Sequence, residues 1–597
     1  MEWALRALAL LLLLPACSNI DRGRVPQQIT LSPGEVSAPP AERALSPESP
    51  FHTLALRAVA QRNRAVAANV ENRVGILQEA DEALLIRLHL FRHSRQRIYI
   101  QTFIWRFDRC GRLLMHELLE AARRGVDVRI LVDQVGLEND PAALAWLSQA
   151  HPNLQIRIYN PIANRLAQDH LSTFVAAGVK FRGVNQRMHN KLILCDGVIG
   201  VTGGRNFEDS YFNRSPKMNF RDRDILAAGP VVGDMEASFA AYWDYRESIP
   251  AADLADVAPW LGPSSDATAL DAYGRGLFDR PHGFASVIAQ ADDRALIGRT
   301  FVQSLVAAPE AWFVADQPGK NNSPHLWGSG HKSRIVADAL VSARRSIVCE
   351  SPYLVLESRE KRLFRELRRD NPDLDIIVTT NSLASTDNTL AYSASYRQRR
   401  LFVEELGFRI HEFRPRPDDL HTMLDRFPAL EVEARRLGLP GRYPYVCLHG
   451  KSFVVDDGLS YIGSFNLDPR SVNLNTEAGL LVRDPRFAAQ LQAQILYNVR
   501  PGNSWIVAQR EFPGEIRRLN AFFESLSEIS PLSIWPVRNT SNFELLPGRE
   551  PAPPSHPDFY KNYRDVGLFP EITAEDTMKA ILTSLLKTFA KPVNPLL

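Results

Sequence analysis

The chain has 597 residues, of which 45% are hydrophobic and 23% are charged. This composition is ordinary for globular proteins, and the length allows two to four domains or two large fused halves. The net charge of +2, from 70 basic and 68 acidic residues, argues against a general polyanion-binding protein, although a locally basic cleft remains compatible with it.

The first 17 residues predict an export signal. Residues 7–14 form an unbroken apolar run that is too short to cross a bilayer as a helix. Pro15 and the small residue Ala16 follow the run and precede Cys17, and this resembles a bacterial lipoprotein cleavage box. An ordinary secretory signal with an incidental cysteine is the alternative. We expect lipidation at Cys17 to anchor the mature chain to the outer membrane, facing the periplasm, with residues 18–73 as a tether.

An internal repeat organises the rest of the chain. In the first copy, the pattern predicts strands at residues 97–103, 126–133 and 154–159, with a helix at 111–124. The second copy has the same order of elements. Its strands are predicted at residues 346–351, 374–380 and 408–413, and its helix at 359–369.

Strands that alternate with helices indicate a parallel or mixed sheet covered by helices. The fold class is therefore α/β, with two tandem sandwich halves at residues 74–249 and 331–500. Between them, residues 250–330 are rich in Pro, Gly, Asp and Asn and predict a loop-rich connection. Residues 501–597 form a C-terminal extension whose last helix, predicted at 573–589, has an apolar stripe along one face.

Each half contains one copy of the motif His-x-Lys-x4-Asp. The copies are His189, Lys191 and Asp196 in the first half, and His449, Lys451 and Asp456 in the second. A glycine and an asparagine follow each His at identical offsets, and two such matches inside a repeat are not expected by chance. These six residues are the predicted catalytic set.

Alternate residues of a strand point to the same face, so the His and Lys of each copy are predicted to share one face of a strand. The aspartates Asp196 and Asp456 stand at an odd offset, at a strand end before a Gly turn. We therefore assign these two aspartates to structural hydrogen bonds within the catalytic motif rather than to direct chemistry.

The residue types suit phosphodiester transfer. One imidazole attacks phosphorus and forms a covalent intermediate, while a second imidazole acts as general acid and base. Lysines and amides stabilise charge on the phosphate oxygens, so Asn206, Ser464 and Asn466 are predicted to bind substrate. A carboxylate is expected to orient each imidazole. Counting back from equivalent dipeptides gives Asp222, with Asp224 as a close rival, and Glu477.

Several strings around these residues resemble the phospholipase D superfamily, and within it the bacterial cardiolipin synthase branch. The strings are RMHNK at 187–191, GGRN at 203–206, TNSLA at 380–384, GSFNLDPRS at 463–471 and NTE at 475–477. The resemblance covers roughly residues 74–500 and implies two α/β halves with the active site at their interface. It also implies phosphohistidine chemistry without a metal or other cofactor, with His189 as nucleophile and His449 as general acid and base.

This resemblance implies phosphatidyl transfer from membrane phospholipids to an alcohol or lipid acceptor, as in cardiolipin synthesis. A phospholipid hydrolase would use the same residues with water as acceptor. A nuclease is a further alternative, but the near-neutral charge and the expected membrane anchor argue against a nucleic-acid partner. The alternative without catalysis is an inactive envelope lipoprotein that binds lipid.

Overall fold

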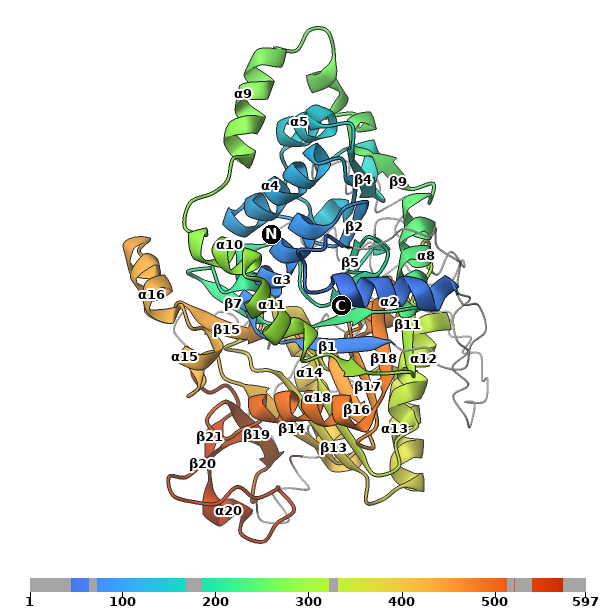
Figure 1. The fold of residues 1–597 in the computed structure, drawn as a ribbon. Coiled ribbons are helices and arrows are strands. Elements are labelled where there is room, and N and C mark those ends of the chain that lie inside the picture. Colours follow the sequence, from blue (N-terminus) through green and yellow to red (C-terminus); the bar gives the residue numbers. More distant parts are fainter. Residues whose placement is uncertain are drawn as a thin grey trace.

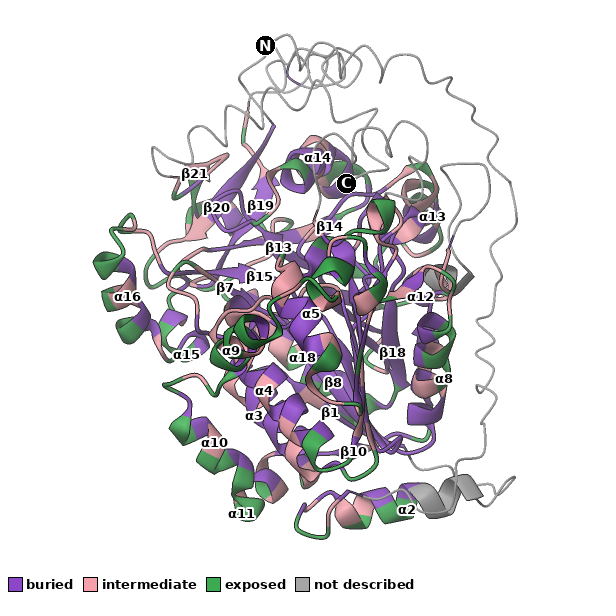
Figure 2. Ribbon diagram, turned by 90° about the horizontal axis from the view of Figure 1, so that it is seen from above, coloured by how far each residue is buried: buried purple, intermediate pink, exposed green. Residues whose placement is uncertain are grey.

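The computed structural model describes residues 45–63, 72–167, 185–320, 331–512, 520 and 539–572. Two mixed sheets form its centre, with the first half in the upper part of Figure 1 and the second half in the lower part. The strands are mostly buried, whereas outer helices such as α9 and α16 expose one face (Figure 2). The predicted pair of α/β halves flanked by helices is confirmed.

The first sheet is built around three parallel strands at the predicted positions, β2 (Arg97–Thr102), β3 (Asp127–Asp133) and β4 (Leu154–Tyr159). An antiparallel β5–β6–β8 meander continues it beside β2. The antiparallel strands are β1 (Arg73–Leu77), β5 (Leu192–Cys195), β6 (Ile199–Gly203), β8 (Asp224–Ala228), β9 (Ser248–Pro250) and β10 (Val306–Ala307).

The second sheet repeats this plan. Its parallel strands are β12 (Ser346–Glu350), β13 (Asp375–Asn381) and β14 (Phe408–Phe413). An antiparallel meander of β16, β17 and β18 lies beside β12, as β5, β6 and β8 lie beside β2. The antiparallel strands are β11 (Ala311–Ala315), β16 (Ser452–Val455), β17 (Leu459–Gly463), β18 (Ala478–Arg483), β19 (Ser504–Gln509), β20 (Thr540–Leu545) and β21 (Tyr563–Gly567).

The predicted helices follow the first parallel strand of each half. They are α4 (Arg109–Arg123) and α13 (Ser358–Asp370). Asp108 begins α4 by accepting a hydrogen bond from the backbone N–H of Gly111, which satisfies one of the free donors of the first turn. The other helices that carry the halves are α3 (Ala80–His93), α5 (Pro141–Ala150), α12 (His331–Val341), α14 (Thr389–Arg400), α16 (Phe427–Arg436) and α17 (Pro469–Asn473).

One apolar cluster joins the two halves. It contains Phe239 of α8 (Val231–Trp243) together with Phe487 and Leu491 of α18 (Pro485–Asn498). These three side chains are at most 1% exposed. Since burying a side chain of this size contributes about 2 kcal/mol, the cluster couples the stability of one half to that of the other.

The structure corrects the predicted tether. Residues 52–63 form α2 (His52–Asn63), and Phe51 and Ala55 are fully buried in the core of the first half. The chain therefore joins the folded body well before residue 73, because this stretch has apolar side chains that the core accepts. The predicted signal with Cys17 and the predicted helix at 573–589 lie outside the described residues.

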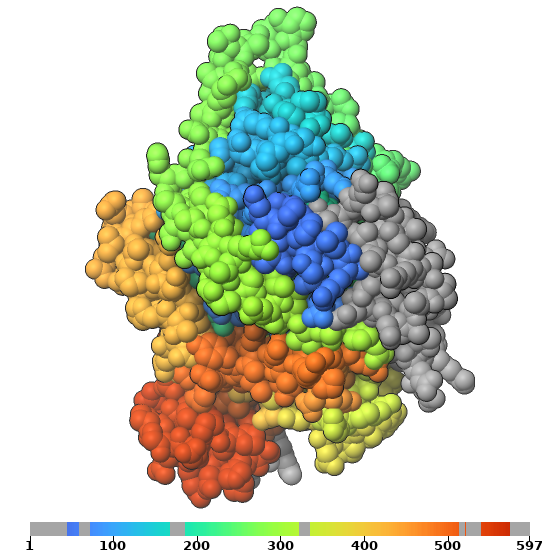
Figure 3. Space-filling view, viewed as in Figure 1, coloured from blue at the N-terminus to red at the C-terminus, as the bar shows by residue number. Residues whose placement is uncertain are grey.

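The connection at 250–330 is more ordered than its composition predicted. It contains α9 (Ala267–Phe278), α10 (Ala285–Asp292) and α11 (Arg294–Ile297), and it contributes β10 and β11 to the two sheets. Figure 3 shows its light green residues packed over the surface of the first half. The many Pro and Gly residues separate short helices here, so the periodic stretches between them were too short to recognise.

The C-terminal extension is also part of the body, because β19, β20 and β21 continue the second sheet beyond β14. Cys110, Cys195, Cys349 and Cys447 are buried free thiols. Within the described part of the chain, no helix has the length and apolar character needed to cross a bilayer.

Candidate active site

The two His-x-Lys stretches lie immediately before equivalent strands, not within them. Strand β5 begins at Leu192 and β16 at Ser452, so each His and Lys precedes its strand. The prediction that His and Lys share a strand face is therefore wrong in its backbone detail. In both copies the Lys side chain turns back, and its ammonium donates to the backbone carbonyl of the His two residues earlier.

The backbone of each histidine is held by the opposite half. The N–H of His189 donates to the carbonyl of Thr476 at 3.0 Å, and the N–H of His449 donates to that of Arg221 at 2.9 Å. Beside His449, β15 (Tyr445–Leu448) pairs in parallel with β7 (Met218–Arg221) of the first half. These pairings between halves replace the expected strand ladder at the His-x-Lys positions.

The orienting carboxylates are also exchanged between the halves. Nδ1 of His189 lies 2.8 Å from Oε2 of Glu477, and Nδ1 of His449 lies 2.5 Å from Oδ2 of Asp222. A carboxylate at Nδ1 fixes the tautomer with the proton on that nitrogen, which leaves Nε2 for chemistry. Each histidine thus depends on a residue from the other half, and neither half holds a complete site.

Asp224, the rival of Asp222, does not orient a histidine. Its Oδ2 forms buried ion pairs with Arg87 at 2.8 Å and with Arg205 at 3.3 Å. Asp224 begins β8, whereas Asp222 stands in the turn before that strand, beside the other half. The alternative is therefore wrong, because the two arginines bind this carboxylate inside the first half.

The two orienting carboxylates have different surroundings. Glu477 accepts hydrogen bonds from the hydroxyls of Ser464 at 2.5 Å and Ser471 at 2.7 Å. Opposite Asp222 the chain has Gly204, where an added Cβ would lie 2.1 Å from the Asp222 Oδ1. The longer side chain, Glu477, thus lies beside Ser464, and the shorter one, Asp222, lies beside Gly204. Ser464, predicted to bind substrate, instead supports the orienting residue of His189.

The two asparagines predicted to bind substrate differ in how their side-chain amides are hydrogen-bonded. The side chain of Asn206 accepts from the N–H of Ile104 at 3.0 Å and donates to the hydroxyl of Tyr211 at 2.8 Å, so its amide is used internally. It supports the Tyr211 ring, whose centroid is 5.4 Å from that of His449. Asn466 is 5% exposed, and its Oδ1 has no hydrogen-bond partner among the described residues. Asn466 therefore stays a predicted substrate ligand.

The motif aspartates lie at the far ends of β5 and β16. Both have a positive φ, 51° at Asp196 and 50° at Asp456, in the turn to the next strand. Their carboxylates accept hydrogen bonds from three consecutive backbone N–H groups, those of residues 95–97 and 344–346 respectively. These contacts fix the start of β2 and β12, which agrees with the structural role expected for both aspartates.

Burial controls the charge of the histidines. Desolvation lowers the pKa of His189 to about 4, although the charge of Glu477 opposes the shift. The pKa of His449 is also lowered, first by burial and then by the charge of Lys451. Both imidazoles are therefore neutral at pH 7 in the protein alone, as a nucleophile or a general base requires.

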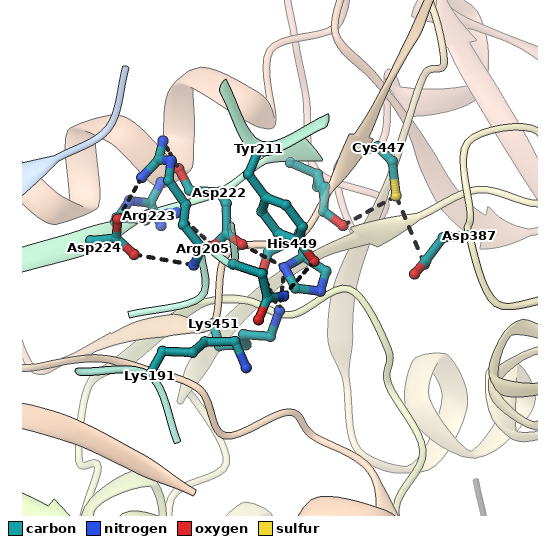
Figure 4. A network of polar contacts seen from close by, with 12 residues as sticks. Lys191, Arg205, Tyr211, Asp222, Arg223, Asp224, Asp387, Cys447, His449 and Lys451 are labelled. Carbon is teal, nitrogen blue, oxygen red and sulfur yellow. Dashed lines mark hydrogen bonds and ion pairs between the residues drawn. The ribbon is translucent and has the colours of Figure 1, made fainter. Parts of the chain in front are cut away.

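The lysines meet beside His449 from opposite halves (Figure 4). Desolvation lowers the pKa of Lys191 to about 7 and also lowers the pKa of Lys451. A phosphodiester anion between the two ammonium groups would favour their charged forms, so the arrangement suits binding of a phosphate. Among the described residues, no group of three or more His, Cys, Asp and Glu side chains is placed to hold a metal ion.

Sequence reasoning missed several residues that hold the site. Asp316 of the connection accepts a hydrogen bond from the N–H of Glu477 at 3.1 Å. The second is Asp387 in the loop after β13, which lies near His449 and accepts a hydrogen bond from the hydroxyl of Tyr353. No motif marks these positions. The position of Asp387 past the carboxyl end of a parallel strand was the one available signal.

Comparison with known proteins places the chain in a family. The family described as "Cardiolipin synthase, PLD-like domain" matches residues 88–243 and 336–497. An uncharacterised protein of Helicobacter pylori (strain ATCC 700392 / 26695) is 31% identical over 428 residues, which cover 70% of this chain and 78% of the relative. Cardiolipin synthase C of Escherichia coli (strain K12) is 29% identical over 428 residues, with coverages of 70% and 83%.

Among solved structures, phosphatidylserine synthase of Haemophilus influenzae Rd KW20 aligns with 77% of this chain and 95% of its own. The sequence identity is 15% and the TM-score is 0.48.

Proposed function

This chain is an enzyme of the phospholipase D superfamily, in the family described as cardiolipin synthase, PLD-like domain, and from that membership we propose that it transfers a phosphatidyl group from a membrane phospholipid to an alcohol. The observation that carries the proposal is the pair of crossed histidine–carboxylate contacts with two lysines beside them. Relatives named cardiolipin synthase C and cardiolipin synthase A support lipids as the substrate class.

In the first step, Nε2 of His189 attacks the phosphorus of the donor lipid and forms a phosphohistidine. His449, protonated for this step, gives its proton to the leaving headgroup oxygen. Lys191 and Lys451 stabilise the negative charge on the non-bridging oxygens. The charge of the bound phosphate raises the pKa of His449 from its lowered value, which provides the protonated form.

In the second step, His449 is neutral and takes a proton from the hydroxyl of the acceptor. The acceptor oxygen attacks phosphorus and the bond to Nε2 of His189 breaks, which gives the new phosphodiester and regenerates the enzyme. Water in place of the alcohol would give phosphatidic acid. The ratio of transfer to hydrolysis thus depends on how well the acceptor is held beside His449.

The test is lipid mass spectrometry of the purified protein in mixed phospholipid vesicles, with and without glycerol. We expect new phosphatidyl products from the wild type, and a loss of about 10³-fold or more in His189→Ala and His449→Ala. Turnover that both variants leave unchanged would disprove catalysis at this site. Nucleic-acid cleavage without any lipid product would favour the nuclease alternative.

A protein with this activity must reach a membrane surface, and we propose that the N-terminal signal and lipidation at Cys17 hold it at the periplasmic side of the outer membrane. Support comes from the apolar run at residues 7–14 and from Cys17 shortly after it. Metabolic labelling with a fatty acid should mark the wild type, whereas an unlabelled chain, or a Cys17→Ala variant labelled to the same extent, would contradict the anchor.

A further inference from the structure

The loop after β13 is fixed rigidly to the residue before His449. The side chain of Asn381 accepts a hydrogen bond from the N–H of Leu448 at 2.9 Å and donates to its carbonyl at 2.8 Å. The hydroxyl of Ser385 bonds Oδ1 of Asn381 at 3.2 Å and donates to the carbonyl of Phe413 at 3.0 Å. Because these groups are buried, the loop presents its next exposed residue at a set position relative to His449.

That exposed residue is Asp387. Its two carboxylate oxygens accept the hydroxyl of Tyr353 at 2.9 and 2.8 Å, and the thiol of Cys447 lies 3.9 Å from Oδ1. No Lys or Arg among the described residues forms an ion pair with it. A carboxylate is an acceptor with about four lone-pair sites, so Asp387 can still accept a further hydrogen bond after these contacts.

The charge of Asp387 acts on the reacting groups. Burial lowers the pKa of both His449 and Lys451, and the negative charge of Asp387 is among the charges that oppose the shift. Figure 4 shows Asp387 and Cys447 on one side of the His449 ring, away from Asp222. An open carboxylate near the position of a phosphate anion is unfavourable by itself, which indicates that a hydrogen-bond donor is its partner during the reaction.

The first half lacks this arrangement. The residue two before His189 is Arg187, at the position that Cys447 occupies before His449, and its guanidinium pairs with the buried Asp133 at 3.3 Å. Asp133 ends β3 as Asn381 ends β13. Like Asn381, it accepts a hydrogen bond from the backbone N–H of the residue before the histidine, here Met188. The open carboxylate is thus a property of the His449 side, where the proposed mechanism puts the acceptor.

We propose that Asp387 determines acceptor specificity. While His449 deprotonates one hydroxyl of the acceptor, the Asp387 carboxylate accepts a hydrogen bond from a second hydroxyl of the same molecule. The preferred acceptor is therefore a polyol with neighbouring hydroxyls, either free or as a lipid headgroup. This inference rests on the proposed phosphatidyl transfer.

The experiment compares glycerol with 1-propanol, which has the same three carbons and one hydroxyl. Full-length protein is incubated with phospholipid vesicles and equal concentrations of both alcohols, and the two phosphatidyl products are quantified by mass spectrometry. We expect the wild type to favour the glycerol product. In Asp387→Ala the ratio of glycerol to propanol product should fall about tenfold, the size expected for losing one hydrogen bond to a charged group.

Asp373→Asn is the matched control, because Asp373 is an exposed acid of the same half in the turn before β13. It should keep the wild-type ratio. If the wild type forms both products and Asp387→Ala leaves the ratio unchanged, the specificity role is disproved while phosphatidyl transfer stands. If the wild type forms neither product, the proposed function fails and the inference fails with it.

Discussion

The two histidines are bound by the same kind of partner in two different ways. His189 faces Glu477, which two serine hydroxyls also hold, whereas His449 faces Asp222, whose Oδ1 accepts the N–H of Arg223. Equal motifs have therefore not produced equal environments. The repeat preserves the positions of the catalytic groups, while the hydrogen bonds around them are free to differ, and that difference suits a reaction in which one imidazole attacks and the other transfers protons.

The largest expected effects come from exchanging Gly204 and Ser464, the small residues next to the two orienting carboxylates. Gly204→Ser places a side chain where the Asp222 carboxylate lies, since a Cβ there would be 2.1 Å from its Oδ1. We expect His449 to lose its partner and kcat/KM for lipid to fall about 10²-fold. Ser464→Gly removes one of three hydrogen bonds to Glu477 and should cost about tenfold or less.

Gly441→Ser is the control, because a Cβ at Gly441 meets no atom within 4 Å. It should keep wild-type kcat/KM. Equal losses in Gly204→Ser and Ser464→Gly, with thermal unfolding unchanged in both, would show that the two carboxylates do not differ in the way described.

The pH dependence of kcat/KM tests the surroundings of His189 separately. In the proposed mechanism His189 must be neutral to attack, so kcat/KM should fall below its pKa of about 4. At high pH kcat/KM should fall as Lys191, with a pKa of about 7, and the proton donor His449, whose pKa burial lowers, lose their protons. The charge of Glu477 raises the pKa values of His189 and Lys191 against the effect of burial. In Glu477→Gln both limbs should therefore move to lower pH, with about a tenfold lower maximum.

The measurement is kcat/KM against pH for wild type and Glu477→Gln. A variant whose limbs move to higher pH, or stay in place, would show that Glu477 does not set the charge of this side of the site. Asp222→Asn provides the comparison, because the charge of Asp222 raises the pKa of His449 and also acts on both lysines.

The smallest expected effect concerns stability. Asp196 is fully buried and Asp456 is half-buried, yet each accepts hydrogen bonds from three backbone N–H groups. Asp196→Ala should lower the free energy of unfolding by about 3 kcal/mol, because it removes a fully buried acceptor of three backbone hydrogen bonds, and Asp456→Ala by about 1 kcal/mol, because water replaces part of its contacts. Urea unfolding measures both values, and a larger loss in Asp456→Ala would contradict this account.

The sequence predicted the features that follow from local pattern. The strands at 154–159 and 408–413 match β4 and β14 residue for residue, because apolar residues alternate in short parallel strands. The His-x-Lys stretch was predicted as strand because the same local pattern continues through it. Its backbone partners are Thr476 and Arg221 of the other half, and contacts at that separation leave no local signal.

The same lack of a local signal explains which site residues could not be predicted from the sequence. Glu477 was found by its place in the repeat. Ser464 was assigned to substrate binding rather than to this carboxylate, and the contacts of Ser471 and Asp316 with Glu477 were not predicted, since no local pattern marks them. Asp222 and Asp224 could not be separated by counting, because only the folded arrangement shows that Arg87 and Arg205 bind Asp224.

Because each histidine takes its carboxylate from the other half, the two partners are synthesised at different times. Glu477 follows His189 by 288 residues, so a ribosome adding about 5 to 20 residues per second completes it tens of seconds after the histidine has emerged. During that interval His189 lacks the carboxylate that orients it, and the first half is chemically incomplete. The site is therefore complete only when the second half has docked onto the first.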